Sequence, residues 1–199
     1  MRRVTIFGGT FDPIHFAHLL TGRDILEVTK ADKIIFLPSF APPHKDVYAS
    51  LDDRLHMVKL AIKDSPEFGC SEFEKTLARP TYTINTLRKL KDELDFVSIS
   101  FIIGMDSACE FASWKEPDAL LREFEMLVIP RPGYERKDVS MRFQKKFRFV
   151  NARRIEISST EIRERVLKGK NIRYLTPVPV VDYIKGKGLY LESGKKGEE

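Results

Sequence analysis

The sequence predicts an α/β fold in which helices cover both faces of a parallel sheet. Runs of β-branched and aromatic residues alternate along the chain with segments in which apolar residues recur at helical spacing. Two of the runs, FVSISFIIG and EMLVIP, are apolar with few interruptions, which is typical of strands covered on both faces. Because strands separated by helices usually pair in parallel, this alternation favours a doubly covered parallel sheet.

The elements of the N-terminal half follow from local signals. RRVTIFGG predicts a strand that ends in a tight turn at its two glycines, and we expect a helix from about His15 to Thr29 after it. DKIIFLPS predicts the second strand. The following APPHKD must be a loop, because consecutive prolines lack N–H donors and push the residue before them into an extended conformation.

Two amphipathic helices are predicted in the middle of the chain, at 51–63 and 82–94. Their apolar residues at helical spacing are Leu55, Val58 and Ile62 in the first helix and Ile84, Leu87 and Leu94 in the second. FVSISFIIG and EMLVIP then supply two further strands.

The pattern changes from about Met141 onward. RRIEIS predicts a strand, and the residues after it predict a short helix with Gly169 near its C-terminal end. A further helix is expected over 177–185. Taken together, the elements predict a Rossmann-like parallel sheet with helices on both faces and a small C-terminal helical subregion.

Length and composition favour a single domain. With 199 residues, of which 42% are hydrophobic, the chain can bury one substantial core, and we expect one domain over 1–190. The tail at 191–199 consists mainly of Gly and charged residues and is expected to fray. Cys70 and Cys109 lie far apart without CxxC spacing, which argues against a disulfide framework or a zinc site.

Charge and hydropathy bound the partners. The 34 basic and 29 acidic residues give a net charge of +5 that is spread along the chain and suits polyanions such as nucleotides. No aromatic-rich RNA platform is evident, so no nucleic-acid partner is expected. No apolar run approaches the roughly 18 residues of a membrane span, and no signal-peptide pattern opens the chain. We therefore expect a cytoplasmic protein without a membrane partner; a homo-oligomer is left open.

The loop after the first strand is the first candidate for a ligand site. Ligands of open α/β sheets bind outside the carboxyl ends of the strands, and Gly8 and Gly9 allow a close approach there. A helix that begins near His15 directs its free N–H groups at an anion, and His15 and His18 can donate to phosphate oxygens. Taken singly, a helical histidine is more often packed or solvated than a ligand, and Asp12 could be only a turn former.

A second candidate is the stretch ISSTEIR. Ser158 or Ser159 followed by Glu161 or Glu164 suits a helix N-cap, which is the structural alternative. Arg163 in the first turn adds a guanidinium to hydroxyls and open N–H groups. Donors that converge on one helix start predict a binding site for several phosphates.

Three further residues lie at expected loop positions. Asp106 follows a strand end by two residues, with Gly104 allowing close approach, and a carboxylate so placed often accepts ribose hydroxyls. Trp114 belongs either to the core or to a site in which it faces a heteroaromatic ring. Lys45 offers a cation on a loop stiffened by prolines, although a solvated lysine is the default.

Six stretches, taken in order, resemble the nucleotidyltransferase superfamily with paired histidines and, within it, bacterial nicotinate-nucleotide adenylyltransferase. The resemblance covers Val4 to about Ile184. The histidine pair and ISSTEIR are common to the superfamily, whereas the other stretches narrow it to the family. The stretches are GGTFDPIHFAH, PPHK, RPTYTINTL, FIIGMDS, the single Trp114 and ISSTEIR.

The resemblance implies transfer of AMP from ATP to nicotinate mononucleotide, which forms nicotinate adenine dinucleotide and pyrophosphate in NAD synthesis. It implies ATP binding by Gly8, Gly9, Thr10, Phe11, His15, His18, Gly104, Asp106, Ser159, Thr160 and Arg163. It implies binding of nicotinate mononucleotide by Lys45, Tyr82, Thr83, Trp114 and Lys115, with backbone N–H groups near Thr83 and Lys115 on the carboxylate. The catalytic groups would be His15, His18, Lys45 and Arg163.

The expected reaction needs neither a general base nor a covalent enzyme intermediate. The attacking phosphate is ionised at neutral pH, since its second pKa is about 6. Donors and cations must align two polyanions and offset charge on the α-phosphate and the leaving pyrophosphate. We expect Mg²⁺ to be bound mainly through ATP, with no metal ligands from the protein.

Two departures from the family and several alternatives remain. Ala17 stands where the family usually has glycine, and Lys115 stands where it often has an aromatic residue. Nicotinamide mononucleotide adenylyltransferase and phosphopantetheine adenylyltransferase are the nearest alternative enzymes. From a different class, the chain could be a non-catalytic nucleotide-binding or RNA-binding protein.

Overall fold

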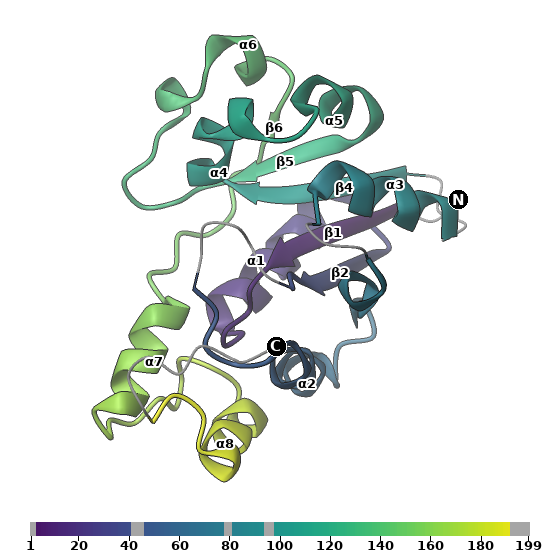
Figure 1. Cartoon of the computed structure of the whole chain (residues 1–199). Helices are drawn as coiled ribbons and strands as arrows, with labels where there is room; N and C mark the ends of the chain where they lie inside the picture. The colour runs from purple at the N-terminus through teal and green to yellow at the C-terminus, as the bar shows by residue number, and fades with distance from the viewer. Residues whose placement is uncertain (1–2, 41–45, 78–80, 94–97, 192–199) are drawn as a thin grey trace.

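A computed structural model describes residues 3–40, 46–77, 81–93 and 98–191 (Figure 1). Its centre is a six-stranded sheet in the order β3-β2-β1-β4-β5-β6, in which every pair of neighbours is parallel. The strand bounds are β1 Arg3–Gly9, β2 Lys33–Pro38, β3 Phe68–Cys70, β4 Ser98–Gly104, β5 Glu125–Ile129 and β6 Arg148–Phe149. Chain order reverses between β1 and β4, which is the point where such sheets bind ligands.

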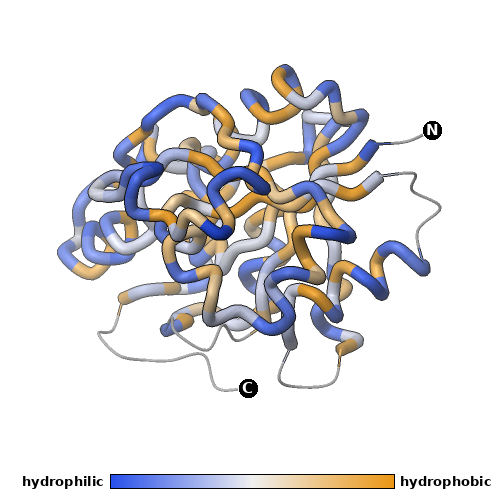
Figure 2. The backbone as a smooth tube through the Cα atoms, turned by 90° about the horizontal axis from the view of Figure 1, so that it is seen from above, coloured by the Kyte–Doolittle hydropathy of each residue, from blue (hydrophilic) through white to orange (hydrophobic). Residues whose placement is uncertain are grey.

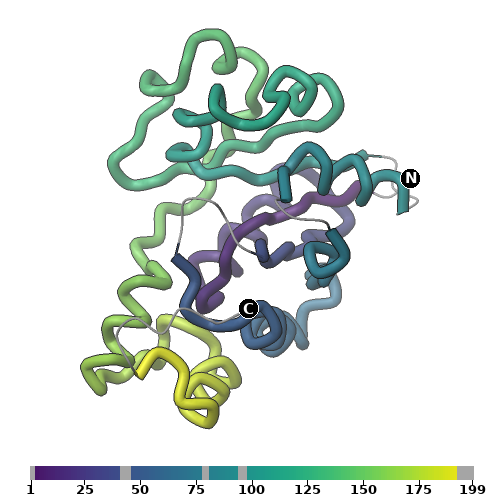
Figure 3. The backbone as a smooth tube through the Cα atoms, in the orientation of Figure 1, coloured from purple at the N-terminus to yellow at the C-terminus, as the bar shows by residue number. Residues whose placement is uncertain are grey.

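The helices occupy both sides of this sheet (Figure 1). The α-helices are α1 Phe16–Thr29, α2 Leu51–Ile62, α3 Thr83–Glu93, α4 Met105–Cys109, α5 Pro117–Glu123, α6 Met141–Gln144, α7 Ser159–Leu167 and α8 Val178–Lys187. Three short 3₁₀ helices are η1 Phe73–Thr76, η2 Phe111–Ser113 and η3 Arg136–Asp138. The C-terminal α7 and α8 lie together at one end of the molecule, and α8 packs against α2 (Figure 3).

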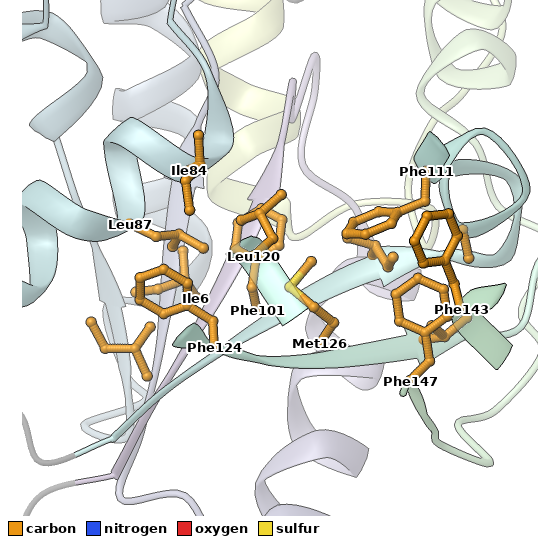
Figure 4. Packing of buried hydrophobic residues seen from close by; sticks show 14 of the residues in the cluster. Ile6, Ile84, Leu87, Phe101, Phe111, Leu120, Phe124, Met126, Phe143 and Phe147 are labelled. Carbon is orange, nitrogen blue, oxygen red and sulfur yellow. The ribbon is translucent and has the colours of Figure 1, made fainter. Parts of the chain in front are cut away.

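Two apolar clusters, one on each face of the sheet, hold the layers together. On one face, Ile84 and Leu87 of α3 and Leu120 of α5 pack with Phe101 and Met126 of the strands (Figure 4). The cluster on the other face takes its residues from α1, α2, α7 and α8. Each fully buried large apolar side chain contributes about 1.5–3 kcal/mol. In the backbone tube of Figure 2, hydrophobic segments run through the middle of the molecule. Hydrophilic and hydrophobic residues alternate along the coiled, helical segments.

Most predicted elements are confirmed. The first two strands and the helix from His15 to Thr29 match β1, β2 and α1, and the predicted helices at 51–63, 82–94 and 177–185 match α2, α3 and α8 within a few residues. FVSISFIIG and EMLVIP form β4 and β5. The short helix predicted after RRIEIS is α7, and Gly169 follows it with a φ of 63°.

The strand predicted in RRIEIS is wrong. Residues 151–158 form no strand, and the edge strand is instead the two-residue β6 directly before them. The N–H of Arg153 donates to the carboxylate of Asp24 at 2.8 Å and pairs with no neighbouring strand. An alternating pattern therefore did not indicate pairing here, because a side chain from α1 satisfies the backbone. Most of the predicted APPHKD loop lies outside the described residues, as does the tail beyond residue 191.

Candidate active site

Two adjoining hollows lie at the carboxyl edge of β1 and β4. The inner cavity, about 230 Å³ in volume, includes residues from the ends of both strands, from η1 and from the first turn of α3. The outer cavity, about 520 Å³ in volume, lies between the loop after β1 and the start of α7. Thr10, His18, Asp106 and Arg131 line both, so the two hollows form one continuous site.

The structure places most of the predicted site residues around these cavities. The inner cavity is lined by Gly8, Gly9, Thr10, His18, Thr83, Gly104, Asp106 and Trp114. The outer cavity is lined by Thr10, His15, His18, Asp106, Ser159, Thr160 and Arg163. Three of the predicted site residues line neither cavity, namely Phe11, Tyr82 and Lys115. The predicted Lys45 lies outside the described residues.

The two histidines form a stacked pair at the start of α1. Their ring centroids are 3.7 Å apart with an angle of 21° between the planes, and the N–H of His15 donates to Nδ1 of His18 at 3.3 Å. Burial, followed by the positive charge of Arg131, lowers the pKa of His15 to about 3, so this ring is neutral at pH 7. With Nδ1 as an acceptor, Nε2 carries the proton of a neutral His18 ring and can donate to an anion.

Phe11 supports the pair from the core. Its ring is 1% exposed and meets the ring of His18 edge-on at 4.9 Å between centroids. A Cβ on Gly9 would lie 3.1 Å from the Phe11 ring, which makes this approach tight. The side chain of Phe11 therefore orients His18 by packing against it.

Asp12 connects three distant segments at the edge of the outer cavity. Its buried carboxylate accepts hydrogen bonds from the N–H of Tyr48 at 2.7 Å, the N–H of Ala49 at 3.2 Å and the hydroxyl of Tyr190 at 2.6 Å. The sequence suggested no more than a turn former at this position. The partners lie 36 to 178 positions away, and no local pattern predicts them.

The first turn of α7 is attached to the loop after β1. Arg163 donates to the carbonyl of Asp12 at 2.8 Å and to the hydroxyl of Thr160 at 3.1 Å. The hydroxyl of Ser159 donates to the carbonyl of Pro13 at 2.9 Å. Ser158 is the N-cap, since its hydroxyl accepts from the N–H of Glu161. The positive end of this helix and the histidine pair thus face the same hollow.

Asp106 presents an oxygen that no described residue satisfies. Its Oδ1 is buried without a hydrogen-bond partner among the described residues, and the nearest cation is Arg131, whose Nε lies 3.8 Å away. A Cβ on Gly104 would lie 2.2 Å from this oxygen and 2.9 Å from Nε of Arg131. A side chain at position 104 would therefore displace the carboxylate or the guanidinium, and the unsatisfied acceptor is available to a ligand hydroxyl. Arg131 was not predicted from the sequence, although it follows the end of β5 as Asp106 follows β4.

Away from Asp106, the inner cavity is lined by an aromatic side chain and by the first residue of α3. Trp114 is half-buried, packs on Phe111 at 5.2 Å between centroids and lines the cavity together with Thr83, the first residue of α3. Nζ of Lys115 lies 4.5 Å from the centroid of the exposed Tyr82 ring, outside the cavity. An aromatic face beside a helix N-terminus suits a flat, negatively charged ligand.

No group of three or more His, Cys, Asp or Glu side chains that could hold a metal ion occurs among the described residues. The described helices also include none that is long and apolar enough to cross a membrane.

Comparison with known proteins identifies the family. The cytidylyltransferase-like family model matches residues 6–165. A protein of Caldicellulosiruptor saccharolyticus named "Probable nicotinate-nucleotide adenylyltransferase" is 38% identical over 96% of this chain and 100% of its own. The chain belongs to the nicotinate-nucleotide adenylyltransferase family. A protein of the same name from Rubrobacter xylanophilus is 37% identical over 98% of this chain and 94% of its own.

A solved structure confirms the predicted fold. The nicotinic acid mononucleotide adenylyltransferase of Plasmodium falciparum, solved in complex with NaAD, superposes with a TM-score of 0.78 over 96% of this chain and 100% of that one. At 23% identity this likeness shows a shared fold. As a member of its family, the chain is a nucleotidyltransferase enzyme.

Polar residues of this adenylyltransferase's inner cavity besides Arg131 were missed from the sequence. Ser39, Glu74 and Thr86 line it together with the predicted residues. Glu74 is only 9% exposed, and nothing in a charged stretch such as SEFEKT distinguishes a buried glutamate from a solvated one. The only available signal was that Ser39 directly follows a strand end.

Proposed function

We propose that the protein transfers AMP from ATP to nicotinate mononucleotide and releases nicotinate adenine dinucleotide and pyrophosphate. The observation that carries the proposal is the shared border of the two cavities at Thr10, His18, Asp106 and Arg131. Groups that can donate hydrogen bonds to phosphate lie on one side of this border. An aromatic face and a helix N-terminus lie on the other side. The names of the curated relatives support the same activity.

ATP would occupy the outer cavity and the border. The N–H groups at the start of α7, together with Arg163, suit the β- and γ-phosphates. Asp106 has a buried oxygen without a partner among the described residues, and it would accept from a ribose hydroxyl. Neutral His15 would hold His18 in place, and His18 would donate to the oxygens of the reacting phosphate.

Nicotinate mononucleotide would occupy the inner cavity. Its pyridine ring would stack on Trp114, and its carboxylate would be bound by backbone N–H groups near Thr83, which lines the cavity, and near Lys115, the residue after Trp114. An amide would turn its NH₂ toward these donors and leave them poorly matched, which favours the acid over nicotinamide mononucleotide.

The transfer would proceed by in-line attack without a covalent enzyme intermediate. The phosphate of the mononucleotide is already ionised at neutral pH, so positioning and charge compensation account for the catalysis. His18, Arg163 and Arg131 would offset the negative charge that grows on the α-phosphate and the leaving pyrophosphate. Lys45 is proposed to add a further cation.

Mg²⁺ fits this site through the nucleotide. Asp106 supplies the one unsatisfied buried carboxylate oxygen of the described part of the chain, which is too few ligands for a protein-held ion. Bound to the ATP phosphates, the ion would neutralise part of their charge.

The test is pyrophosphate release with ATP and Mg²⁺ and one acceptor at a time. We expect nicotinate mononucleotide to give the highest kcat/KM among nicotinate mononucleotide, nicotinamide mononucleotide and phosphopantetheine. A higher value for phosphopantetheine would overturn the assignment. Binding of ATP and of RNA without any pyrophosphate release would support the non-catalytic alternative instead.

A further inference from the structure

The backbone of Phe40, which follows the cavity residue Ser39, is held by two buried side chains of opposite charge. The N–H of Phe40 donates to Oε2 of Glu74 at 3.3 Å, and the carbonyl of Phe40 accepts from Nη2 of Arg54 at 3.0 Å. Phe40 lies two residues after β2. Its backbone is therefore fixed from α2 on one side and from η1 on the other.

Arg54 connects this segment to the loop after β1. The side chain is fully buried and donates to the carbonyls of Thr10 at 3.0 Å, Ser39 at 2.6 Å and Ala49 at 3.1 Å. A planar guanidinium holds several acceptors in a rigid geometry, which an ammonium group cannot do. Thr10 and Ser39 both line the inner cavity.

Glu74 connects the same segment to the start of α3. Its Oε2 accepts from the hydroxyl of Thr81 at 3.0 Å, and its Oε1 accepts from the hydroxyl of Thr86 at 3.4 Å. Thr83, which we propose to bind nicotinate mononucleotide, lies between these two threonines in the sequence. Glu74 and Thr86 themselves line the inner cavity. A continuous series of hydrogen bonds thus runs from Thr10 to α3.

We propose that Arg54 and Glu74 are positioning residues that act through the backbone of Phe40 and set the separation between the loop after β1, which would bind ATP, and the start of α3. This inference rests on the proposed function. Buried charges seldom add net stability over well-packed apolar residues, so stability alone does not account for them. In-line transfer is sensitive to geometry, and a displacement of about 1 Å can cost roughly 100-fold in rate.

Glu74→Gln is the decisive variant. A glutamine has one acceptor oxygen where glutamate has two, and it carries no charge, so the Phe40 N–H and the two threonine hydroxyls could not all keep a carboxylate acceptor. We expect kcat/KM for nicotinate mononucleotide to fall roughly 10- to 100-fold. We expect the Kd of a non-hydrolysable ATP analogue, measured by calorimetry, to stay within about twofold of the wild-type value. The reason is that the hydrogen bonds of Glu74 lead to α3, on the side of the site where nicotinate mononucleotide would bind.

Glu72→Gln is the matched control. Glu72 is two residues away, is exposed and pairs with Lys59 and Lys75 on the surface. This variant should keep the wild-type kcat/KM. Because Glu74→Gln could lower the folded fraction, its melting temperature is measured in parallel, and Thr81→Val removes one donor to Glu74 without changing any charge.

A kinetic double-mutant cycle tests the relay, by which we mean the series of hydrogen bonds from Thr10 through Arg54, the Phe40 backbone and Glu74 to α3. If Arg54→Lys and Glu74→Gln act through the backbone of the same residue, Phe40, the fold-loss of kcat/KM in the double variant should be less than the product of the two single losses. If Arg54→Lys does not fold, the cycle is run with Thr81→Val. Losses that multiply, an unchanged kcat/KM in Glu74→Gln, or an equal loss of ATP-analogue binding would each overturn the inference.

Failure of the proposed function is distinguishable from failure of the relay. Wild-type protein is assayed first with each of the three acceptors, and the variants are then compared on whichever acceptor gives the highest turnover. If the wild type prefers a different acceptor substrate, the proposed function is refuted. The double-mutant cycle, run with that substrate, still decides whether the relay exists. A wild-type protein that turns over none of the three overturns both.

Discussion

The hydroxyl of Tyr190 donates a 2.6 Å hydrogen bond to the carboxylate of Asp12, 178 positions earlier in the chain. Asp12 also accepts from the backbone at the start of α2, and its carbonyl accepts from Arg163. Burial, followed by the nearby Asp12 carboxylate, raises the pKa of Tyr190 well above its usual value, so the phenol remains a donor at neutral pH. The last described turn of the chain therefore stabilises the loop that carries the histidine pair.

Tyr190→Phe should lower the free energy of unfolding by about 1–3 kcal/mol, because Asp12 stays buried with one donor fewer. Urea denaturation at pH 7 measures the loss. Tyr174→Phe is the control, since Tyr174 is 86% exposed and its change should have almost no effect. Equal stability of the two variants would mean that the Tyr190 hydrogen bond contributes nothing.

His15→Asn should reduce the loss of stability in acid. Below pH 6.5 the unfolded chain protonates this histidine, whereas in the folded protein its pKa is lowered to about 3. The unfolded state thus binds more protons between these values, and stability falls as the pH decreases through this window, by at most about 1.4 kcal/mol per pH unit. Asparagine is itself a favoured N-cap, so α1 should be preserved.

The measurement is urea denaturation of wild type and His15→Asn at several pH values from 7 down to 4. The wild type should show the steeper decrease, and the difference between the two curves isolates His15 from the carboxylates. Parallel curves for His15→Asn and wild type would contradict the assignment.

His18→Ala should lower turnover by roughly 100-fold or more, the usual effect of removing a donor that acts in the transition state. The melting temperature should change little, since His18 is only half-buried. Steady-state pyrophosphate release provides the measurement, with His56→Ala as the matched histidine control. A well-folded variant with wild-type turnover would remove His18 from the proposed role.

Gly104→Ala should weaken ATP binding at least roughly tenfold, because the new Cβ would lie 2.2 Å from the Asp106 carboxylate and displace it. Calorimetric titration with a non-hydrolysable ATP analogue is the test. Gly186→Ala, in the open surroundings of α8, should leave the affinity unchanged and stabilise the protein by about 0.5–1 kcal/mol. Unaltered affinity in Gly104→Ala would refute the importance of the close approach.

Local patterns were sufficient for most of the secondary structure. Apolar runs stopped by glycine or proline predicted β1, β2, β4 and β5, helical spacing predicted α2 and α3, and α1 was expected after the turn that ends the first strand. The three-residue β3 and the short α4, α5 and α6 were not predicted, because so few residues carry no periodicity. The strand predicted in RRIEIS is wrong because an alternating sequence does not report whether a partner strand is within reach.

The sequence by itself determined the sheet-and-helix alternation and the placement of His15, His18 and Asp106 after strand ends, because strand and helix periods and turn residues act over a few positions. Only the tertiary structure decided that Arg54 and Glu74 are buried and bind the backbone of the same residue, and that Asp12 accepts a hydrogen bond from Tyr190. Buried polar groups take whatever partners the folded chain brings near them. Those partners lie 14 to 178 positions away, beyond the range of any local pattern.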